Sequence, residues 1–145
     1  MLYMPLGNEV LTQKMIENAF ADGKTVLVPV TDGETFEISA HKIEQDTKFE
    51  VGVFSLKEPK FKELFDKDKI DVVLVPGVAF SRRGTRIGFG KGCYDRFLKE
   101  CKATKVGFFY EFQLTEKIIS DSFDIDMNYI VTEKEIIDCK AELSI

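Results

Sequence analysis

One stretch of the sequence, residues 71–98, holds most of the residues that could do chemistry. It begins as an apolar run and breaks at Pro76-Gly77. It then carries three arginines and four glycines, at Arg82, Arg83, Arg86, Gly84, Gly88, Gly90 and Gly92. Glycine lets a backbone approach a ligand closely, and a helix N-terminus presents N–H groups and partial positive charge. Because the residues from Tyr94 onward are typical of a first helical turn, the stretch is predicted to cradle phosphate.

Two cations strengthen this prediction. Arg86 and Lys91 can neutralise phosphate oxygens, and the loop amides, including those of Phe89 and Cys93, can point inward whatever their side chains. The spacing from Gly88 to Gly92 is G-x-G-x-G, which is not the dinucleotide fingerprint. Without its neighbours the motif would be typical of a plain turn, so the prediction depends on the surrounding cations.

Several carboxylates have two open interpretations. Asp95, directly after the glycines, is either a helix-start acid that stabilises the dipole or a magnesium ligand beside bound phosphates. Asp124 and Asp126 precede the last expected strand and are either loop carboxylates or part of the site. Glu9 would otherwise be a helix-start acid, and Gln113 a surface amide.

Composition limits the class of protein. The chain has 145 residues, 44% of them hydrophobic and 31% charged, with a net charge of −5. This charge argues against general nucleic-acid binding, which needs a basic face. No apolar run approaches the roughly 18–20 residues that cross a membrane. Three scattered cysteines and one histidine make a zinc site improbable and indicate a reducing cytoplasm.

Hydrophobic periodicity predicts alternating strands and helices. Strands are expected over 2–4, 25–30, 35–39, 49–53, 70–75, 105–109 and 128–131. Helices are expected over 11–20, 61–65, 94–101 and 114–120, the first capped by Asn8 or Thr12 and ended by Gly23. The continuous apolar run at 25–30 favours a parallel sheet covered on both faces. We therefore expect one domain over 1–145, a three-layer α/β/α sandwich with a mainly parallel, Rossmann-like sheet.

The run VPGVAFSRRGTRIGFGKGCYDRFL, residues 75–98, resembles the signature of the 5-formyltetrahydrofolate cyclo-ligase family. That family shows the pattern V-P-G-x-A-F-d-x-x-G-x-R-L-G-x-G-x-G-Y-Y-D-R-x-L. Agreement continues in chain order at Tyr3, Asn8-Glu9-Val10-x-Thr12, Glu58-Pro59, Gln113, Phe123-Asp124 and Val131-Thr132-Glu133. The departures from the pattern are Leu11, Ser81, Cys93 and Phe123. The family's helical segment with Lys-x-x-x-Arg, which helps to bind ATP, has no counterpart here, so a form short at its N-terminus is expected.

The resemblance implies ATP-dependent cyclisation of 5-formyltetrahydrofolate to 5,10-methenyltetrahydrofolate, with release of ADP and phosphate. It implies that the ATP phosphates contact Arg86, Gly88, Phe89, Gly90, Lys91, Gly92, Cys93 and Tyr94, with Arg86, Lys91 and Tyr94 catalytic. Asp95 and Asp124 would hold Mg²⁺, and Glu9, Phe80, Tyr94 and Gln113 would contact the folate. We expect a cytoplasmic monomer or weak homodimer with no nucleic-acid or membrane partner. The alternatives are a catalytically incomplete nucleotide- or folate-binding fragment and a related sugar-phosphate or CoA enzyme.

Overall fold

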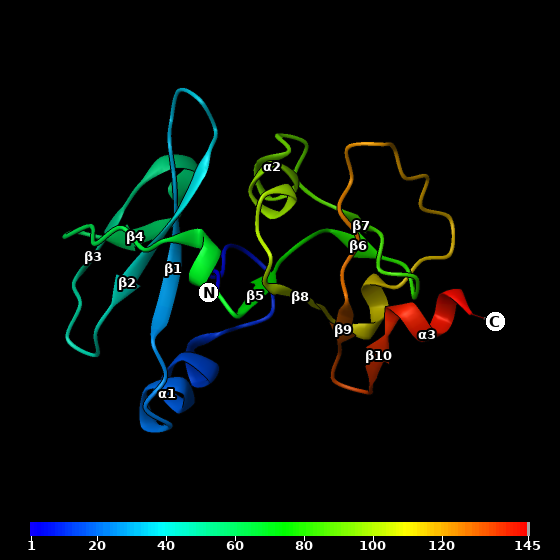
Figure 1. The fold of residues 1–145 in the computed structure, drawn as a ribbon, viewed down its shortest axis with the longest axis horizontal. Helices are drawn as coiled ribbons and strands as arrows, with labels where there is room; N and C mark the ends of the chain where they lie inside the picture. Colours follow the sequence, from blue (N-terminus) through cyan, green and yellow to red (C-terminus); the bar gives the residue numbers. More distant parts are fainter. Residues whose placement is uncertain (145) are drawn as a thin grey trace.

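The computed structural model describes residues 1–144, and over that range strands and helices are mixed along the chain (Figure 1). The α-helices are α1 (Gln13–Ala21), α2 (Cys93–Lys99) and α3 (Cys139–Leu143). The strands are β1 (Val26–Thr31), β2 (Ile38–Ile43), β3 (Phe49–Val51), β4 (Lys57–Pro59), β5 (Val72–Val75), β6 (Ala79–Phe80), β7 (Arg86–Ile87), β8 (Thr104–Phe108), β9 (Tyr129–Val131) and β10 (Ile136–Asp138). Short 3₁₀ turns are η1 (Val53–Ser55), η2 (Lys67–Lys69) and η3 (Glu111–Gln113).

The central sheet has the strand order β10-β9-β8-β5. β5 and β9 both pair with β8 in parallel, and β10 closes the sheet antiparallel to β9. Three further ladders, β1–β2, β3–β4 and β6–β7, are all antiparallel. The fold is therefore mixed α/β. The expected mainly parallel arrangement is correct for the central sheet and wrong for the smaller ladders.

The apolar strand β1 shows why that expectation failed. Its first residues are buried, as a parallel strand would be, yet it pairs antiparallel with β2. The connection is too short for a parallel crossover, which needs a dozen or more residues. Asp32 closes the turn, because its carboxylate accepts hydrogen bonds from the amides of Glu34 and Thr35, both at 2.8 Å.

Two expected helices, over 61–65 and 114–120, are absent from the described structure. In the first segment, Leu64 forms a β-bridge with His41 and the amide of Phe65 donates to the carbonyl of Ala40 at 2.9 Å. In the second, Leu114 forms a bridge with Phe80. Both segments therefore use their backbone groups along neighbouring strands, and tertiary pairing outweighs helical spacing.

Residues 2–4 lie between two sheets without forming an assigned strand. The amide of Leu2 donates to the carbonyl of Leu27 in β1, and the amide of Leu74 in β5 donates to the carbonyl of Met1, both at 2.9 Å. This segment therefore connects the β1–β2 hairpin to the central sheet.

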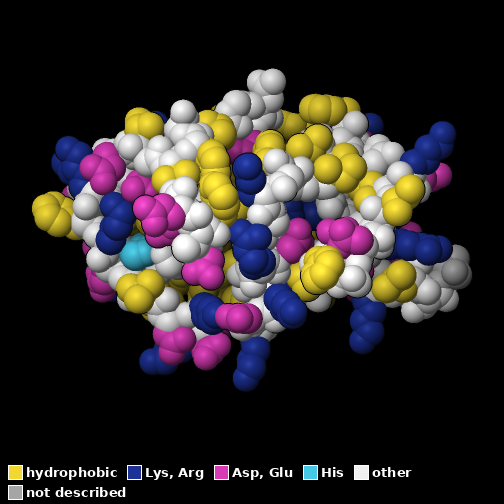
Figure 2. Space-filling model, turned by 90° about the horizontal axis from the view of Figure 1, so that it is seen from above, with side chains coloured by type: hydrophobic (Ala, Val, Ile, Leu, Met, Phe, Trp, Pro, Cys, Tyr) yellow, Lys and Arg dark blue, Asp and Glu magenta, His cyan; other side chains and the backbone are white. Residues whose placement is uncertain are grey.

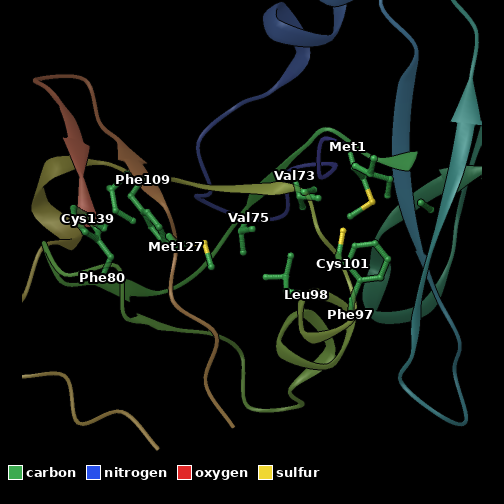
Figure 3. Close-up of a cluster of buried hydrophobic side chains, with 14 of the residues drawn as sticks. Met1, Val73, Val75, Phe80, Phe97, Leu98, Cys101, Phe109, Met127 and Cys139 are labelled. Carbon is green, nitrogen blue, oxygen red and sulfur yellow. The ribbon is translucent and has the colours of Figure 1, made fainter. Parts of the chain in front are cut away.

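The core lies around β5 and extends to both sides of it (Figure 3). Phe97 and Leu98 of α2 belong to the same buried cluster as Val73 and Val75 of β5. Burying each large apolar side chain stabilises the fold by about 1.5–3 kcal/mol. The inner face of α2 is thereby held in the core beside the strand that precedes the glycine loop.

The helices are short. Within residues 1–144 the longest, α1, has 9 residues. None of the described helices therefore approaches the roughly 20 residues that a membrane-spanning helix requires.

Candidate active site

A cavity of about 850 Å³ collects most of the residues singled out by the sequence. It is bounded by the N-terminal segment, the β1–β2 hairpin, the η1 turn, the glycine loop with α2, and residues 118–124. The predicted residues that line it are Glu9, Arg86, Gly88, Phe89, Gly90, Lys91, Gly92, Cys93, Tyr94, Asp95 and Asp124. Residues more than a hundred positions apart are thus brought to one site.

The face seen from above in Figure 2 carries lysine and arginine side chains near its middle. Hydrophobic and acidic side chains lie to either side of them.

The glycines of the loop allow its close approach to Arg86. A Cβ atom on Gly88 would lie 2.8 Å from Nη1 of Arg86, so a side chain there would displace the guanidinium. Gly90 has a φ of +92°, which favours glycine. The loop leads directly into α2, whose cap residue Gly92 supplies no side-chain hydrogen bond, so the first-turn amides stay available to other acceptors.

Arg86 is buried at the base of the cavity, with 7% of its surface exposed. Its Nη1 donates to the carbonyl of Pro76 at 3.3 Å, and its Nη2 lies 3.5 Å from Oδ1 of Asp95. The guanidinium also lies 5.6 Å from the ring centroid of Tyr94. Its Nε is buried and has no hydrogen-bond partner among the described residues. Burial lowers the pKa of Arg86, although the nearby carboxylate of Asp95 opposes that shift.

The two predicted metal ligands both line the cavity. Oδ1 of Asp95 accepts a hydrogen bond from the amide of Ile125 at 3.1 Å, which ties α2 to the segment that carries Asp124. Oδ2 of Asp124 accepts from the amide of Asp121 at 2.9 Å. Within residues 1–144, no group of three or more His, Cys, Asp and Glu side chains forms a complete metal site. Two carboxylates are nevertheless a suitable set for Mg²⁺, which binds one or two of them together with phosphate and water oxygens.

Three further polar groups that line the cavity have shifted pKa values. Burial raises the pKa of Glu9 above its usual value, although the Leu6 amide donates to its Oε1 at 2.7 Å and opposes the shift. Burial also raises the pKa values of the Tyr3 and Tyr94 hydroxyls, so both remain protonated near neutral pH. The Tyr3 hydroxyl donates to the carbonyl of Val10 at 2.7 Å.

Phe80 and Gln113 were expected to contact the folate, and neither lines the cavity. Phe80 is fully buried and stacks on Phe109 with ring centroids 4.9 Å apart. Gln113 holds a loop, since its Nε2 donates to the carbonyls of Gly77 and Val78 at 3.0 and 3.1 Å. In this structure the two residues contribute to packing and loop closure, and their contact with the folate stays a prediction.

The sequence reading missed Tyr3, Phe54 and Lys57 as cavity residues. The sequence indicates Tyr3 only as part of an expected strand and of the resemblance. Phe54 lies in η1 with a φ of 57°, a conformation that a phenylalanine rarely adopts. No local pattern distinguishes these residues, because they reach the cavity only through contacts between segments that are distant in the sequence.

Comparison with known proteins agrees with this geometry. The 5-formyltetrahydrofolate cyclo-ligase family matches residues 1–133, which is most of the chain. The chain belongs to this family. Among curated cyclo-ligases, the protein of Escherichia coli (strain K12) is 28% identical over 144 residues, covering 93% of this chain and 78% of that protein. The Saccharomyces cerevisiae cyclo-ligase is 35% identical over 117 residues, covering 68% of this chain and 54% of that protein.

Solved cyclo-ligase structures share the fold. The 5,10-methenyltetrahydrofolate synthetase of Aquifex aeolicus superposes with a TM-score of 0.83 at 37% identity, covering 96% of this chain and 70% of that one. The synthetase of Mycoplasma pneumoniae gives a TM-score of 0.70 at 26% identity, covering 89% and 69% of the two chains. The resemblance seen in residues 75–98 is thus confirmed over nearly the whole chain.

Proposed function

We propose that this protein catalyses the ATP-dependent cyclisation of 5-formyltetrahydrofolate to 5,10-methenyltetrahydrofolate, with release of ADP and phosphate. The observation that carries the proposal is the convergence on one cavity of a glycine-rich loop, a buried arginine with an unpaired Nε, and two carboxylates. Membership of the cyclo-ligase family supports the same reaction.

The reaction needs an activated formyl oxygen, because that oxygen is a poor leaving group. The formyl oxygen attacks the γ-phosphorus, and the bond between that phosphorus and the β–γ bridging oxygen breaks to release ADP. In the resulting phosphorylated imidate, the neighbouring folate amine attacks the formyl carbon. The amine loses its proton and the carbon–oxygen bond breaks, so that phosphate departs. Such transfers depend on positioning and on neutralising charge.

The glycine loop and its cations would hold the phosphates. The backbone amides from Gly88 to Cys93 would approach the phosphate oxygens closely, and Arg86 and Lys91 would supply positive charge. The buried Nε of Arg86 would gain its missing acceptor from a phosphate oxygen. Because a buried donor without a partner costs about 1–3 kcal/mol, filling this position strengthens phosphate binding at the base of the cavity.

Asp95 and Asp124 would hold Mg²⁺ between them and the phosphates. When bound there, the ion neutralises charge on the transferring phosphoryl group. Their own hydrogen bonds to the amides of Ile125 and Asp121 orient both carboxylates before any ligand arrives.

Glu9 and Tyr94, which both line the cavity, would contact the folate. The Tyr94 hydroxyl, kept protonated by its raised pKa, can donate a hydrogen bond to the substrate. Glu9, partly buried, can accept a hydrogen bond from the amino groups of a pterin ring. Phe80 and Gln113 have no part in this assignment.

The decisive experiment is an absorbance assay in the near ultraviolet with purified protein, ATP, Mg²⁺ and 5-formyltetrahydrofolate. The conjugated amidinium of the methenyl product absorbs where the substrate does not. We expect an increase that requires both ATP and Mg²⁺ and is matched by release of one phosphate per product. Reactions without ATP, and reactions with EDTA in place of Mg²⁺, are the controls.

Absence of product would overturn the catalytic proposal. If ATP and folate still raised the melting temperature, the protein would instead be the catalytically incomplete binder that the sequence left open. If neither ligand changed the melting temperature, the cavity would not be a functional nucleotide and folate site.

Further properties belong to the same proposal. We propose that residues 1–145 act as one domain with a three-layer, Rossmann-like arrangement. We also propose a cytoplasmic location, no nucleic-acid partner, and a monomer or weak homodimer. Sedimentation over a range of concentrations tests the oligomeric state, and limited proteolysis that yields a stable subfragment would contradict the single domain.

A further inference from the structure

One residue of the β1–β2 hairpin that the proposed mechanism does not use contacts the glycine loop and α2. That residue is Phe36, which lies between β1 and β2. Lys91 of the glycine loop places its Nζ 5.1 Å from the centroid of the Phe36 ring. A cation over an aromatic face is attracted by the ring quadrupole, so the ring restrains the lysine.

The backbone of Phe36 makes a second connection. Its carbonyl accepts a hydrogen bond from Nη2 of Arg96 at 3.1 Å. Nη1 of the same guanidinium donates to the carbonyl of Lys91 at 2.9 Å. Arg96 therefore connects Phe36 to the backbone of the loop, while the Phe36 ring contacts the side-chain ammonium of Lys91. The ring thus contacts the Lys91 ammonium directly, and the carbonyl is linked to the Lys91 backbone through Arg96.

On its other side Phe36 supports a second wall of the cavity. Its ring stacks on that of Phe54, with centroids 5.7 Å apart and planes at 19°. Phe54 lines the cavity. Phe36, Phe54 and Ser55 have φ values of 60°, 57° and 61°, which non-glycine residues rarely adopt. Backbone strain of this kind persists where the surroundings over-determine it and clusters at functional sites.

We propose that Phe36 is a positioning residue for the reaction, resting on the proposed function. It holds the ammonium of Lys91 beside the cavity, ready for the ATP phosphates, and it joins the glycine loop to the wall that carries Phe54. Lys91 would otherwise be a flexible lysine in a glycine-rich loop, and ordering it would weaken ATP binding. Phe36 therefore acts on the nucleotide through Lys91 without touching it.

The test compares Phe36→Leu with Phe36→Tyr. Both replacements carry the same positive-φ strain, but only tyrosine keeps an aromatic face for the lysine and for Phe54. We expect Phe36→Leu to raise the KM for ATP by about 3- to 10-fold, since it removes both the cation–π contact with Lys91 and the aromatic stack on Phe54. Phe36→Tyr should stay within twofold of the wild type. Melting temperatures of both variants report any general loss of stability.

A Lys91→Met background separates positioning from mere structure. If Phe36 acts through Lys91, adding Phe36→Leu to Lys91→Met should leave the KM for ATP unchanged. The proposal would be overturned if Phe36→Leu raised the KM for ATP equally in the wild-type and the Lys91→Met backgrounds. It would also be overturned if Phe36→Leu and Phe36→Tyr had the same KM for ATP.

The role of Phe36 can be tested even if the protein does not catalyse the proposed reaction. If the wild-type protein makes no product, the same five proteins are compared by the Kd of ATP in titration calorimetry, which needs no turnover. A weaker Kd for Phe36→Leu only when Lys91 is present would support the positioning role. Wild-type protein that binds no ATP at all would overturn both proposals.

Discussion

At the scale of single residues, Arg86 and Asp95 form a charge pair on the cavity wall. A guanidinium with 7% exposure has lost most of its hydration, and Asp95 at 3.5 Å compensates for only part of it. Such a pair is sensitive to the removal of either partner, because the remaining charge stays buried. The Nε of Arg86 adds a buried donor that has no partner among the described residues.

Asp95→Asn is expected to lower kcat on the order of 100-fold, the usual cost of losing one preorganised electrostatic group. Asparagine keeps an oxygen for the Ile125 amide, so the fold should be retained, but the Arg86 charge stays buried without its carboxylate and the melting temperature should fall. Turnover assays measure the loss of kcat, and a circular dichroism melt measures the stability of the fold. Asp126→Asn removes an exposed carboxylate that does not line the cavity, and it should leave turnover unchanged. Unchanged turnover in Asp95→Asn would remove Asp95 from the site.

Phe80→Ala is expected to destabilise the fold by about 3–5 kcal/mol, as removal of a fully buried ring usually does. Because Phe80 lies outside the cavity, the KM for the folate should stay within twofold at a temperature where the variant is folded. Urea unfolding gives the stability and initial rates give the KM. A raised KM with normal stability would restore Phe80 to the folate site.

At the scale of elements, α1 is held by a buried hydroxyl where a conventional N-cap was expected. Thr12 precedes the helix and is fully buried, but its side chain makes no cap hydrogen bond. Instead its Oγ1 donates to the carbonyl of Tyr3 at 2.7 Å. This bond fixes the start of α1 against the segment whose Tyr3 and Glu9 line the cavity.

Thr12→Val is expected to cost about 1–3 kcal/mol of stability, because the shape is kept while the carbonyl of Tyr3 loses its donor. Thr12→Ser retains the hydroxyl and is the matched control. Equilibrium unfolding in urea measures both. A valine variant as stable as the wild type would mean that the Tyr3 carbonyl finds another donor.

At the scale of the whole molecule, stability should depend on pH through the buried histidine. His41 has 7% exposure, its Nε2 lies 2.9 Å from Oγ of Ser39, and its Nδ1 has no partner among the described residues. Burial, followed by the charge of Lys62, lowers the pKa of His41 below 6.5. The unfolded chain therefore binds this proton more readily than the folded chain does.

We expect the contribution of His41 to the free energy of unfolding to be fully present above about pH 6.5 and to fall as the pH drops below that value. Urea unfolding of the wild type and of His41→Gln, in steps from pH 7.5 to 5.5, measures it. The wild type should lose stability more steeply than the variant. Parallel curves would show that His41 titrates alike in the folded and unfolded states.

Much of this protein follows from local sequence. Glycine spacing, the cations and the short helix after them predicted the loop from Gly88 to Gly92, and the structure has it at the cavity. The strand at β5 and the helix α2 were also predicted, because each buries a compact local set of apolar side chains. Local chemistry and periodicity are sufficient where the residues of a feature are neighbours in the chain.

Only the tertiary structure decided the rest. The segments at 61–65 and 114–120 have helical spacing, yet they pair with distant strands, and β1 pairs with β2 across a short turn. Whether Phe80 or Phe54 lines the cavity cannot be read from either residue, since both are aromatic and lie in apolar surroundings. Their places depend on contacts between segments far apart in sequence, whose energies exceed local preference and exist only once the chain has folded.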